Sequence, residues 1–586
     1  MLPSPGTTLP ARARLSRIAV PTLVVGSLIA TAFATVTARP ESAAAAAVGT
    51  YTIGPTAIAL NQSTDPELGV ITPTADAADA GMFGSQQAWP LLALHASLAR
   101  NGHVITYGSP LGASTQNGVA YDDWDPSAGF GAHVDTASMH GYDSFCNSAV
   151  TLADGRLLMV SGQYNPASSS EMSTMLYDPL TRSQDMGADL AYKRWYVTAL
   201  RLTDNRILLL GGGDAGNTQT YQNPDANAGV ATTPEIGTGT GAWRQLPGAE
   251  STILFGARDN HWWYPRAFNA PTGGVVGFSG DLIWTLSTDG AGSTKQVGTL
   301  PFNPRVSGSQ VMYAPGKILV AGGGQNEQAD GIVANDDAAV VDVTTATPVV
   351  TRTASMAHRR NWLNLTVLPT GDVLANGGTI TGTAAGEANS VKQVEIWNPE
   401  TGTWRTGASA QRTRTYHQTA LLLPSGGVLT AGGGGATYTG SGAVFGPENN
   451  LNAEMFYPSY LFTKSATGAV TWASRPAITA ISGSATYGGS VGLTIGGGRA
   501  ISSASLISVP TVTHDQNTDQ RRIPLDITQN GATVTATLPG SVDAMPPGAY
   551  ELTVVDGKGV PSAAQIITIR EGAAGQVTVA PGNADA

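Results

Sequence analysis

The sequence predicts an all-β fold, with a repeated propeller in the middle of the chain and a β-sandwich after it. Of the 586 residues, 72 are Gly and only 12% are charged. This composition disfavours helical bundles and suits many short strands joined by tight turns. Short apolar strands that end in a pair of small residues recur along the middle of the chain. After Arg475 the pattern changes to alternating polar and apolar residues between Gly, Pro and Asn turns.

The repeat comprises seven units, most of them about 50 residues apart, a period typical of propeller blades. A turn precedes several of the strands, and an aromatic residue is followed after a turn by a Trp, as in VEIWNPETGTWRTG. This pattern indicates four-stranded kelch blades around an axis. We therefore expect a seven-bladed kelch-type β-propeller over residues 85–470. The seven strands end near Gly108, Gly162, Gly211, Gly280, Gly322, Gly377 and Gly432.

The C-terminal part of the chain has the pattern of a separate domain. Segments such as SVGLTIGG, ATVTATLPG and AQIITIRE alternate polar and apolar residues between turns. About 100 residues of this kind are typical of a β-sandwich. We expect this domain over residues 475–572, and a loose tail over residues 573–586.

The first 50 residues resemble a targeting segment. Arg12, Arg14 and Arg17 precede an uncharged apolar stretch, and small residues follow it. This is the order of a secretory signal peptide. The apolar stretch, at about 19 residues, is also long enough to remain as an uncleaved membrane anchor. We expect the protein to be secreted or extracellular, either released or anchored in a membrane through its N-terminal segment.

Charge and cysteine content exclude several classes of protein. There are 31 Lys+Arg and 42 Asp+Glu residues, a net charge of −11, and no basic run lies beyond the N-terminus. A nucleic-acid partner would require a basic surface, so this class is set aside. Cys146 is the only cysteine, which excludes an intramolecular disulfide and a thiolate metal cluster. We expect a monomer.

The repeat places particular side chains in a common register. Fifteen residues before the small-residue pair, the second unit has Cys146, the third Tyr196 and the sixth Trp362, whereas Tyr416 is one residue off in the seventh. Equivalent positions of a propeller face one another across its axis. We therefore expect Cys146, Tyr196, Tyr416 and the neighbouring His417 at one mouth of the channel. Adjacent strand residues point to opposite faces, so Tyr416 and His417 share a site only if the backbone departs from strand geometry there.

Several long segments resemble the galactose oxidase and glyoxal oxidase family of copper-radical oxidases. They are YDSFCNSAVTLADGRLLMVSG, KRWYVTALRLTDNRILLLGGG and RTYHQTALLLPSGGVLTAGGGG, followed by AEMFYPSYLF and THDQNTDQRRIPL. The Trp before the tyrosine in RWY favours the bacterial glyoxal-oxidase-like branch. The resemblance implies a seven-bladed kelch propeller and an immunoglobulin-like C-terminal domain, which reaches a loop into the propeller to complete the site.

The resemblance also implies a mononuclear copper site with a radical cofactor made from the protein. Cys146 and Tyr196 become a thioether-crosslinked pair, with Tyr196 as copper ligand and radical site. His417 and His514 become imidazole ligands, and Tyr416 becomes the axial phenol. Two nitrogens and two phenolic oxygens suit Cu(II). In the implied reaction Tyr416 is the general base, the Tyr196 radical abstracts hydrogen from carbon, and dioxygen is released as hydrogen peroxide.

An aromatic residue shields the crosslinked ring in this family. Our candidate is Trp243, the blade tryptophan of GAWRQLPG, because it follows the Tyr196 unit in the blade pattern. A structural blade tryptophan is the alternative interpretation. The rival candidates are Trp195 and the cluster of His261, Trp262 and Trp263.

The substrate is expected to differ from galactose. Thr379 stands where galactose oxidase presents a glutamine that contacts the sugar. Arg305 is a candidate for a sugar-binding arginine, although a solvated surface position is the simpler interpretation. Small aldehydes, simple primary alcohols and terminal units of an exported glycan are the expected substrates.

Two other functions compete with the oxidase. One is a catalytically silent kelch propeller that binds glycans or proteins outside the cell, but such a module has no need for all five residues of the implied site. The other is a hydrolase or lyase, for which Asp122–Asp125 is the only local carboxylate cluster. Taken singly, the site residues also have structural interpretations, such as a buried cysteine acting as a small apolar side chain.

Overall fold

The computed structural model describes one compact unit within Ala47–Ala586. The predicted signal segment falls outside the described residues, apart from its last position. No helix among the described residues is long and apolar enough to cross a membrane, and the only α-helix among them is α1 (Ala77–Ala80). The described residues are 50–53, 65–110, 113, 116–162, 170–214, 227–325, 332–382, 387–434, 437–439, 442–444, 450–482, 484–571 and 576–581.

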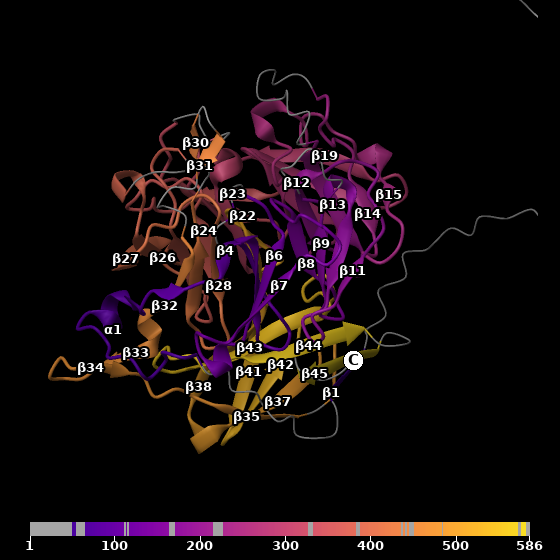
Figure 1. The fold of residues 1–586 in the computed structure, drawn as a ribbon. Coiled ribbons are helices and arrows are strands. Elements are labelled where there is room, and N and C mark those ends of the chain that lie inside the picture. The colour runs from indigo at the N-terminus through magenta and orange to yellow at the C-terminus, as the bar shows by residue number, and fades with distance from the viewer. Residues whose placement is uncertain are drawn as a thin grey trace, which may run out of the picture. The chain divides into compact units, whose positions relative to one another are not determined.

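Seven antiparallel blades surround a common axis, so the predicted all-β propeller is confirmed (Figure 1). In each blade the small-residue pair found in the sequence lies near the end of the second strand, either within it or just after it. Blades one to three contain β4 (Leu91–Leu98), β5 (Val104–Pro110), β6 (Ala120–Trp124) and β7 (His133–Ala137); β8 (Ser148–Thr151), β9 (Leu157–Val160), β10 (Thr174–Tyr177) and β11 (Gln184–Met186); and β12 (Trp195–Arg201), β13 (Ile207–Gly213), β14 (Glu235–Gly237) and β15 (Arg244–Gln245).

The remaining blades follow the same order, and apolar side chains fill the space between neighbouring blades, as between blades three and four. Blades four to six contain β16 (Arg266–Asn269), β17 (Val275–Ser279), β18 (Leu282–Ser287) and β19 (Ser293–Thr299); β20 (Ser309–Ala314), β21 (Lys317–Ala321), β22 (Ala338–Asp342) and β23 (Val349–Arg352); and β24 (Asn364–Val367), β25 (Val373–Asn376), β26 (Gln393–Asn398) and β27 (Thr403–Ser409).

The seventh blade joins strands from both ends of the propeller. Its outer strand β2 (Met82–Phe83) precedes blade one in the chain and pairs with β32 (Asn452–Tyr457). The pairing of β2, which comes first in the propeller, with β32, which comes last, closes the ring. The propeller therefore begins at Met82, before the predicted boundary at residue 85. The other strands here are β3 (Gln87–Ala88), β28 (Gln418–Leu422) and β29 (Val428–Gly432), with two separate hairpins, β30 (Thr437–Thr439) with β31 (Gly442–Val444) and β33 (Phe462–Lys464) with β34 (Val470–Trp472).

The C-terminal strands form the predicted immunoglobulin-like sandwich, which has its own apolar core. The sheet extends into the predicted tail, because β45 (Gln576–Pro581) pairs with β44, and β1 (Thr50–Ile53) pairs with β45. The expectation of a loose tail over residues 573–586 is therefore wrong for this strand. The other strands are β35 (Ile478–Ser482), β36 (Ser484–Thr486), β37 (Ser490–Ile495), β38 (Ile501–Ser508), β41 (Arg522–Asn530), β42 (Thr533–Thr537), β43 (Gly548–Asp556) and β44 (Gln565–Glu571).

One hairpin of the C-terminal region leaves the sandwich and enters the propeller. Strands β39 (Thr511–Thr513) and β40 (Gln516–Thr518) belong to the sheet of blade one, where β39 pairs with the innermost strand β4. Thr513 is opposite His95 in this pairing. The next residue, His514, is thereby carried to the propeller axis.

The small-residue pairs are required by close backbone contacts. A Cβ atom at Gly211 would lie 2.5 Å from the carbonyl oxygen of Trp262, at the start of the next blade. A Cβ atom at Gly377 would lie 2.6 Å from the carbonyl oxygen of Arg414, again in the next blade. Both glycines also have a positive φ, which side chains other than Gly rarely adopt. The pairs therefore let each blade begin directly against its neighbour.

Buried ion pairs hold three of these blade starts in place. In each, an arginine just before the first strand pairs with a glutamate on the third strand, and its Nη1 donates to the carbonyl of the first Gly of the pair. An arginine that is tied to both a carboxylate and a carbonyl fixes the turn between them. The pairs are Arg194 with Glu235 at 2.8 Å, Arg360 with Glu395 at 2.9 Å, and Arg414 with Glu454 at 3.0 Å.

We predict that Glu395→Ala destabilises the fold by about 3–5 kcal/mol, because it leaves the buried Arg360 without its carboxylate. The measurement is urea unfolding followed by tryptophan fluorescence. The control is Asp337→Ala, which breaks the solvent-exposed ion pair with Arg352 and should cost less than about 1 kcal/mol. Equal effects of the two substitutions would contradict the structural importance of the buried pair.

Candidate functional site

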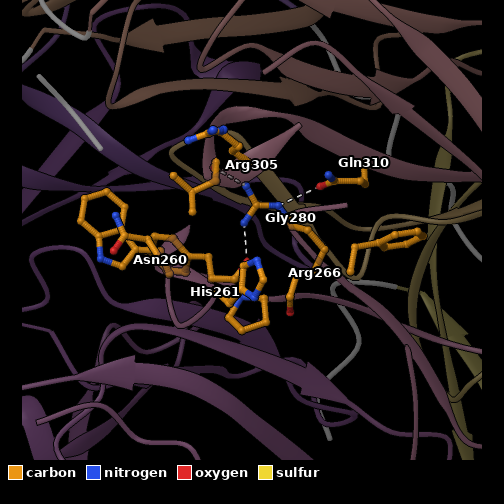
Figure 2. A pocket seen from close by; sticks show the side chains of 12 residues that line it. Asn260, His261, Arg266, Gly280, Arg305 and Gln310 are labelled. Atoms are coloured by element: carbon orange, nitrogen blue, oxygen red, sulfur yellow. Dashed lines mark hydrogen bonds between the residues drawn. The ribbon is translucent and has the colours of Figure 1, made fainter. Parts of the chain in front are cut away.

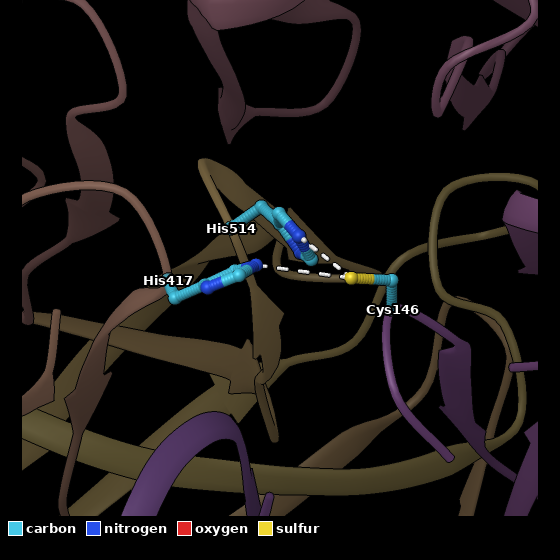
Figure 3. A group of neighbouring side chains, drawn as sticks. All are labelled: Cys146, His417 and His514. Atoms are coloured by element: carbon cyan, nitrogen blue, oxygen red, sulfur yellow. Dashed lines mark hydrogen bonds between the residues drawn. The ribbon is translucent and has the colours of Figure 1, made fainter. Parts of the chain in front are cut away.

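Three potential metal ligands from distant parts of the chain meet at the propeller axis (Figure 3). Cys146 comes from the start of blade two, His417 from the start of blade seven, and His514 from the inserted hairpin. The sulfur of Cys146 lies 3.7 Å from Nε2 of His417 and 3.5 Å from Nε2 of His514. All three side chains are buried, and their ligand atoms lie within 4.8 Å of one another.

Two tyrosines complete this group. The hydroxyl oxygens of Tyr196 and Tyr416 are 2.5 Å apart. The backbone N–H of Tyr196 donates to the carbonyl of Cys146 at 3.3 Å, so the starts of blades two and three lie side by side. The ring centroids of Tyr416 and His417 are 3.9 Å apart. The structure thus brings together all five residues that the family resemblance implied: Cys146, Tyr196, Tyr416, His417 and His514.

A shared backbone conformation turns these side chains towards the axis. Positive φ angles occur at the blade-start residues, which we define as Cys146, Tyr196, Tyr264, Trp362 and His417. At His417 the φ of 67° breaks the strand alternation, so that Tyr416 and His417 both face the site. The departure from strand geometry that the sequence required is confirmed. Non-glycine residues with such φ angles are costly and cluster at functional sites.

Burial keeps the two histidines neutral. It lowers the pKa of His417 to about 3 and holds the pKa of His514 well below its usual range. Burial also raises the pKa of the Cys146 thiol. A neutral imidazole presents a lone pair, the form that binds a metal ion. Nδ1 of His514 is hydrogen-bonded to Oγ1 of Thr513 at 2.7 Å, which leaves Nε2 directed at the site.

Polar contacts lock the hairpin that carries His514. The side-chain amide of Asn364 donates to the carbonyl of His514 at 3.2 Å. The hydroxyl of Ser309 donates to the carbonyl of Asp515 at 2.7 Å, and the Asp515 carboxylate pairs with Arg266 at 2.8 Å. Blades four, five and six therefore each contribute to the position of one histidine.

The group has the composition of a copper site. His417 and His514 offer two imidazole nitrogens, and Tyr196 and Tyr416 offer two phenolic oxygens. Nitrogen and oxygen donors in such a set suit Cu(II) in tetragonal geometry. Nε2 of His417 is the nitrogen that points into the site, towards the sulfur of Cys146, and it is available to bind a metal ion.

The ring that stacks on Tyr196 is Trp263. Its ring centroid is 4.3 Å from that of Tyr196 at an interplanar angle of 17°, whereas Trp195 lies at 4.2 Å but is tilted by 52°. The choice of Trp243 was wrong. Trp243 packs against the core between blades two and three, and its Nε1 donates to the carbonyl of Ala188. It therefore has the structural role of a blade tryptophan.

Sequence analysis missed two buried residues of this region. Tyr264 lies 5.2 Å from Tyr196 between ring centroids, and its hydroxyl donates to the carbonyl of Asn147. It occupies the register position of the fourth unit, counted from Ser279, so the register would have found it. His95, on β4, stacks on Tyr107 at 4.4 Å, and no partner for its ring nitrogens lies among the described residues. Only the hairpin pairing brings His95 close to His514.

The other candidates from the sequence lie elsewhere or in other roles. Asp122 and Asp123 are strand residues of blade one that bind His133 and His103, so the carboxylate cluster is not part of the axial site. Thr379 is buried, and its hydroxyl donates to the carbonyl of Gly382. Arg305 is only half-buried and lines a pocket between blades four and five (Figure 2).

Comparison with known proteins agrees with this fold. The model of the glyoxal oxidase N-terminus matches residues 293–460, and that of the galactose oxidase-like early set domain matches residues 475–569. A galactose oxidase from Gibberella zeae is 29% identical over 524 residues, which cover 85% of this chain and 72% of the relative. The aldehyde oxidase GLOX of Vitis pseudoreticulata is 25% identical over 453 residues, covering 73% and 82%.

A solved structure shares the fold. A fungal alcohol oxidase in complex with copper superimposes with a TM-score of 0.68 and 22% identity, covering 84% of this chain and 99% of that one. The propeller, the inserted hairpin and these relatives together define an oxidoreductase. The two family models and these relatives confirm the resemblance of this chain to the galactose oxidase and glyoxal oxidase family.

We predict that the metal-free protein loses stability as the pH falls from about 6.5. His417 has a pKa of about 3 in the folded protein. Below about pH 6.5 the imidazole of His417 is therefore protonated in the unfolded chain but stays neutral in the folded protein. Below the unfolded pKa, this one group contributes a slope of about 1.4 kcal/mol per pH unit.

The measurement is the free energy of unfolding of metal-free protein between pH 7 and pH 5. His417→Gln should have a shallower slope than the wild type, because glutamine does not titrate. Thr345→Ala, at an exposed position that does not titrate, is the control and should keep the wild-type slope. An unchanged slope in His417→Gln would contradict the neutral buried imidazole.

Proposed function

We propose that this protein is a copper-radical oxidase that oxidises a primary alcohol or an aldehyde and releases hydrogen peroxide. The observation that carries the proposal is the convergence of Cys146, Tyr196, Tyr416, His417 and His514 on one buried point. A binding module with no catalytic function would not need a buried thiol, two phenols and two neutral imidazoles in contact, which disfavours the silent propeller.

The single cysteine has a role in this proposal that requires no second cysteine. Cys146 forms a thioether bond to the ring of Tyr196, with loss of the thiol hydrogen and one ring hydrogen to dioxygen. The backbone hydrogen bond between the two residues supports this pairing. Sulfur on the ring makes the tyrosine easier to oxidise, and the stacked Trp263 covers the ring on one side.

His417, His514, Tyr196 and Tyr416 would hold the copper ion. Copper, when bound, supplies a one-electron acceptor and a Lewis acid for the substrate oxygen. Tyr416 accepts the hydroxyl proton of the substrate as general base, and the oxidised Tyr196 ring takes a hydrogen atom from the substrate carbon. The alcohol loses two electrons and two protons in all, and dioxygen takes them up to become hydrogen peroxide. The buried rings around Tyr196 exclude water from this step.

The substrate class and location of the protein are further parts of the proposal. Small aldehydes, primary alcohols and terminal glycan units fit it, and the relatives named an aldehyde oxidase and an alcohol oxidase support the first two. The N-terminal pattern of arginines, apolar residues and small residues supports export, either with release or with an anchor in the membrane.

We predict that Cu(II) and dioxygen convert the purified protein to a form two hydrogens lighter, with loss of its only titratable thiol. Intact mass spectrometry and thiol titration in denaturant measure this, and they distinguish crosslinking from oxidation of sulfur, which adds mass. Cys146→Ser and Tyr196→Phe should show no mass loss and no peroxide. If the loaded wild type keeps its thiol and forms no peroxide with aldehydes, alcohols or sugars, the oxidase proposal fails.

We predict that Tyr416→Phe lowers kcat by about 10²–10⁴, because it removes the general base. The crosslink mass should still form, since Cys146 and Tyr196 are intact. The measurement is steady-state peroxide production at saturating copper. Tyr313→Phe, at a residue that packs against the apolar core between blades five and six, is the matched control. A kcat near the wild-type value in Tyr416→Phe would contradict the assigned base.

A further inference from the structure

A polar pocket lies beside the proposed centre, between the starts of blades four and five. It is partly open to solvent and is lined by residues from the starts of both blades. Trp263 and Tyr264 line this pocket, and both also contact the ring of Tyr196. The pocket and the proposed centre therefore share a wall, which these two rings form.

One of the two guanidinium groups that line the pocket makes no ion pair with a described residue. Two arginines line it, and none of its lining residues is a carboxylate. Arg266 is committed, since it pairs with Asp515 and donates to the side chain of Gln310. The guanidinium of Arg305 has no partner among the described residues and is half-buried. An unpaired guanidinium beside a pocket favours a carboxylate, which it can bind through two hydrogen bonds.

A buried acceptor lies across the pocket from this charge. Nδ1 of His261 is hydrogen-bonded to the carbonyl of Ile253 at 2.7 Å, and a carbonyl can only accept, so Nδ1 carries the proton. Nε2 therefore presents a lone pair, and no partner for it lies among the described residues. The side chain is only 6% exposed. An acceptor that is buried without a partner is unfavourable, and a ligand hydroxyl that donates to it would remove this cost.

The backbone keeps this acceptor open. A Cβ atom at Gly280 would lie 2.9 Å from Nε2 of His261 and 3.2 Å from Oδ1 of Asn303. That same oxygen accepts the backbone N–H of Arg305 at 2.9 Å. Arg305 itself has a positive φ of 50°. Left-handed conformations of non-glycine residues are costly and are found where a site requires them. Figure 2 shows Arg305 at the upper edge of the pocket and His261 at its lower edge.

We propose that this pocket binds the end of a substrate that carries a carboxylate and an adjacent hydroxyl group, with Arg305 binding the carboxylate and Nε2 of His261 accepting the hydroxyl proton in a hydrogen bond. The inference deepens the proposed oxidase function and rests on it for the identity of the ligand as a substrate. It assigns selectivity to residues outside the metal ligands.

The binding test uses metal-free protein and calorimetry with lactate, which has the carboxylate and the hydroxyl but no primary alcohol. Lactamide removes the charge, and propanoate removes the hydroxyl. Lactate should bind, and both analogues should bind more weakly. In Arg305→Met the Kd for lactate should rise at least about tenfold, the value of one charge-assisted contact. Arg244→Met, on the outer strand of blade three, is the matched control and should bind lactate as the wild type does.

His261→Phe separates recognition from a structural role. It should abolish the preference for lactate over propanoate, while the preference for lactate over lactamide remains. A variant that had merely lost its fold would lose both preferences, and its melting temperature would show this. If the wild type does not bind lactate, binds lactamide equally well, or is unaffected by Arg305→Met, the inference is overturned.

Copper-loaded enzyme tests the same site during turnover. Glycerate should have a higher kcat/KM than propane-1,2-diol, and Arg305→Met should reduce this ratio at least about tenfold. If lactate binds as described but no peroxide forms with any substrate, the oxidase function fails and the binding site stands. If peroxide forms without any preference for glycerate and lactate does not bind, the function stands and the inference fails.

Discussion

The close packing of each blade start against the glycine pair of its neighbour is the constraint on which the rest of this structure depends. Carbonyl oxygens such as those of Trp262 and Arg414 occupy the space that side chains at Gly211 and Gly377 would need. The next glycine N–H then donates to the same carbonyl, as Gly212 does to Trp262 at 2.8 Å. Because this contact fixes where each first strand begins, it also fixes where the blade-start side chains point. The geometry of the site therefore follows from the packing of each blade start against the neighbouring blade.

The buried ion pairs and the inserted hairpin act on this same geometry. Arg194 and Arg360 reach from the blade start to a glutamate two strands away and to the glycine carbonyl, and so hold the turn from both sides. A ring of similar blades does not place a potential metal ligand on the axis itself. The hairpin supplies one, His514. His514 is held there by contacts to Asn364 and, through Asp515, to Arg266. Propeller and sandwich therefore have to fold together before the five residues meet.

Burial serves the proposed chemistry as much as stability. Loss of solvent lowers the pKa values of His417 and His514, which keeps both imidazoles in the form that binds a metal ion. The aromatic side chains of Trp195, Trp263 and Tyr264 surround Tyr196 and exclude water from its ring. The pocket beyond Trp263 is polar and partly open by contrast. In our proposals the indole ring of Trp263 therefore separates the reacting groups from the residues that select the substrate. This division allows substrate preference to change without a change of metal ligands.

The repeat in the sequence predicted the fold class and the common register of Cys146, Tyr196 and Trp362, because a closed ring forces equivalent positions to recur at equal distances from each small-residue pair. The assignment of His514 rested on family resemblance, since no repeat contains it. Only the tertiary structure decided which ring covers Tyr196. Trp243 follows Tyr196 in the same blade but lies on its outer part, whereas Trp263 is far along the chain and begins the adjacent blade. The pairing of β1 with β45 joins two segments that belong to no repeat, so the repeat pattern did not predict it. The same holds for the pocket that Arg305 and His261 line, because these two residues do not occupy equivalent positions of the repeat.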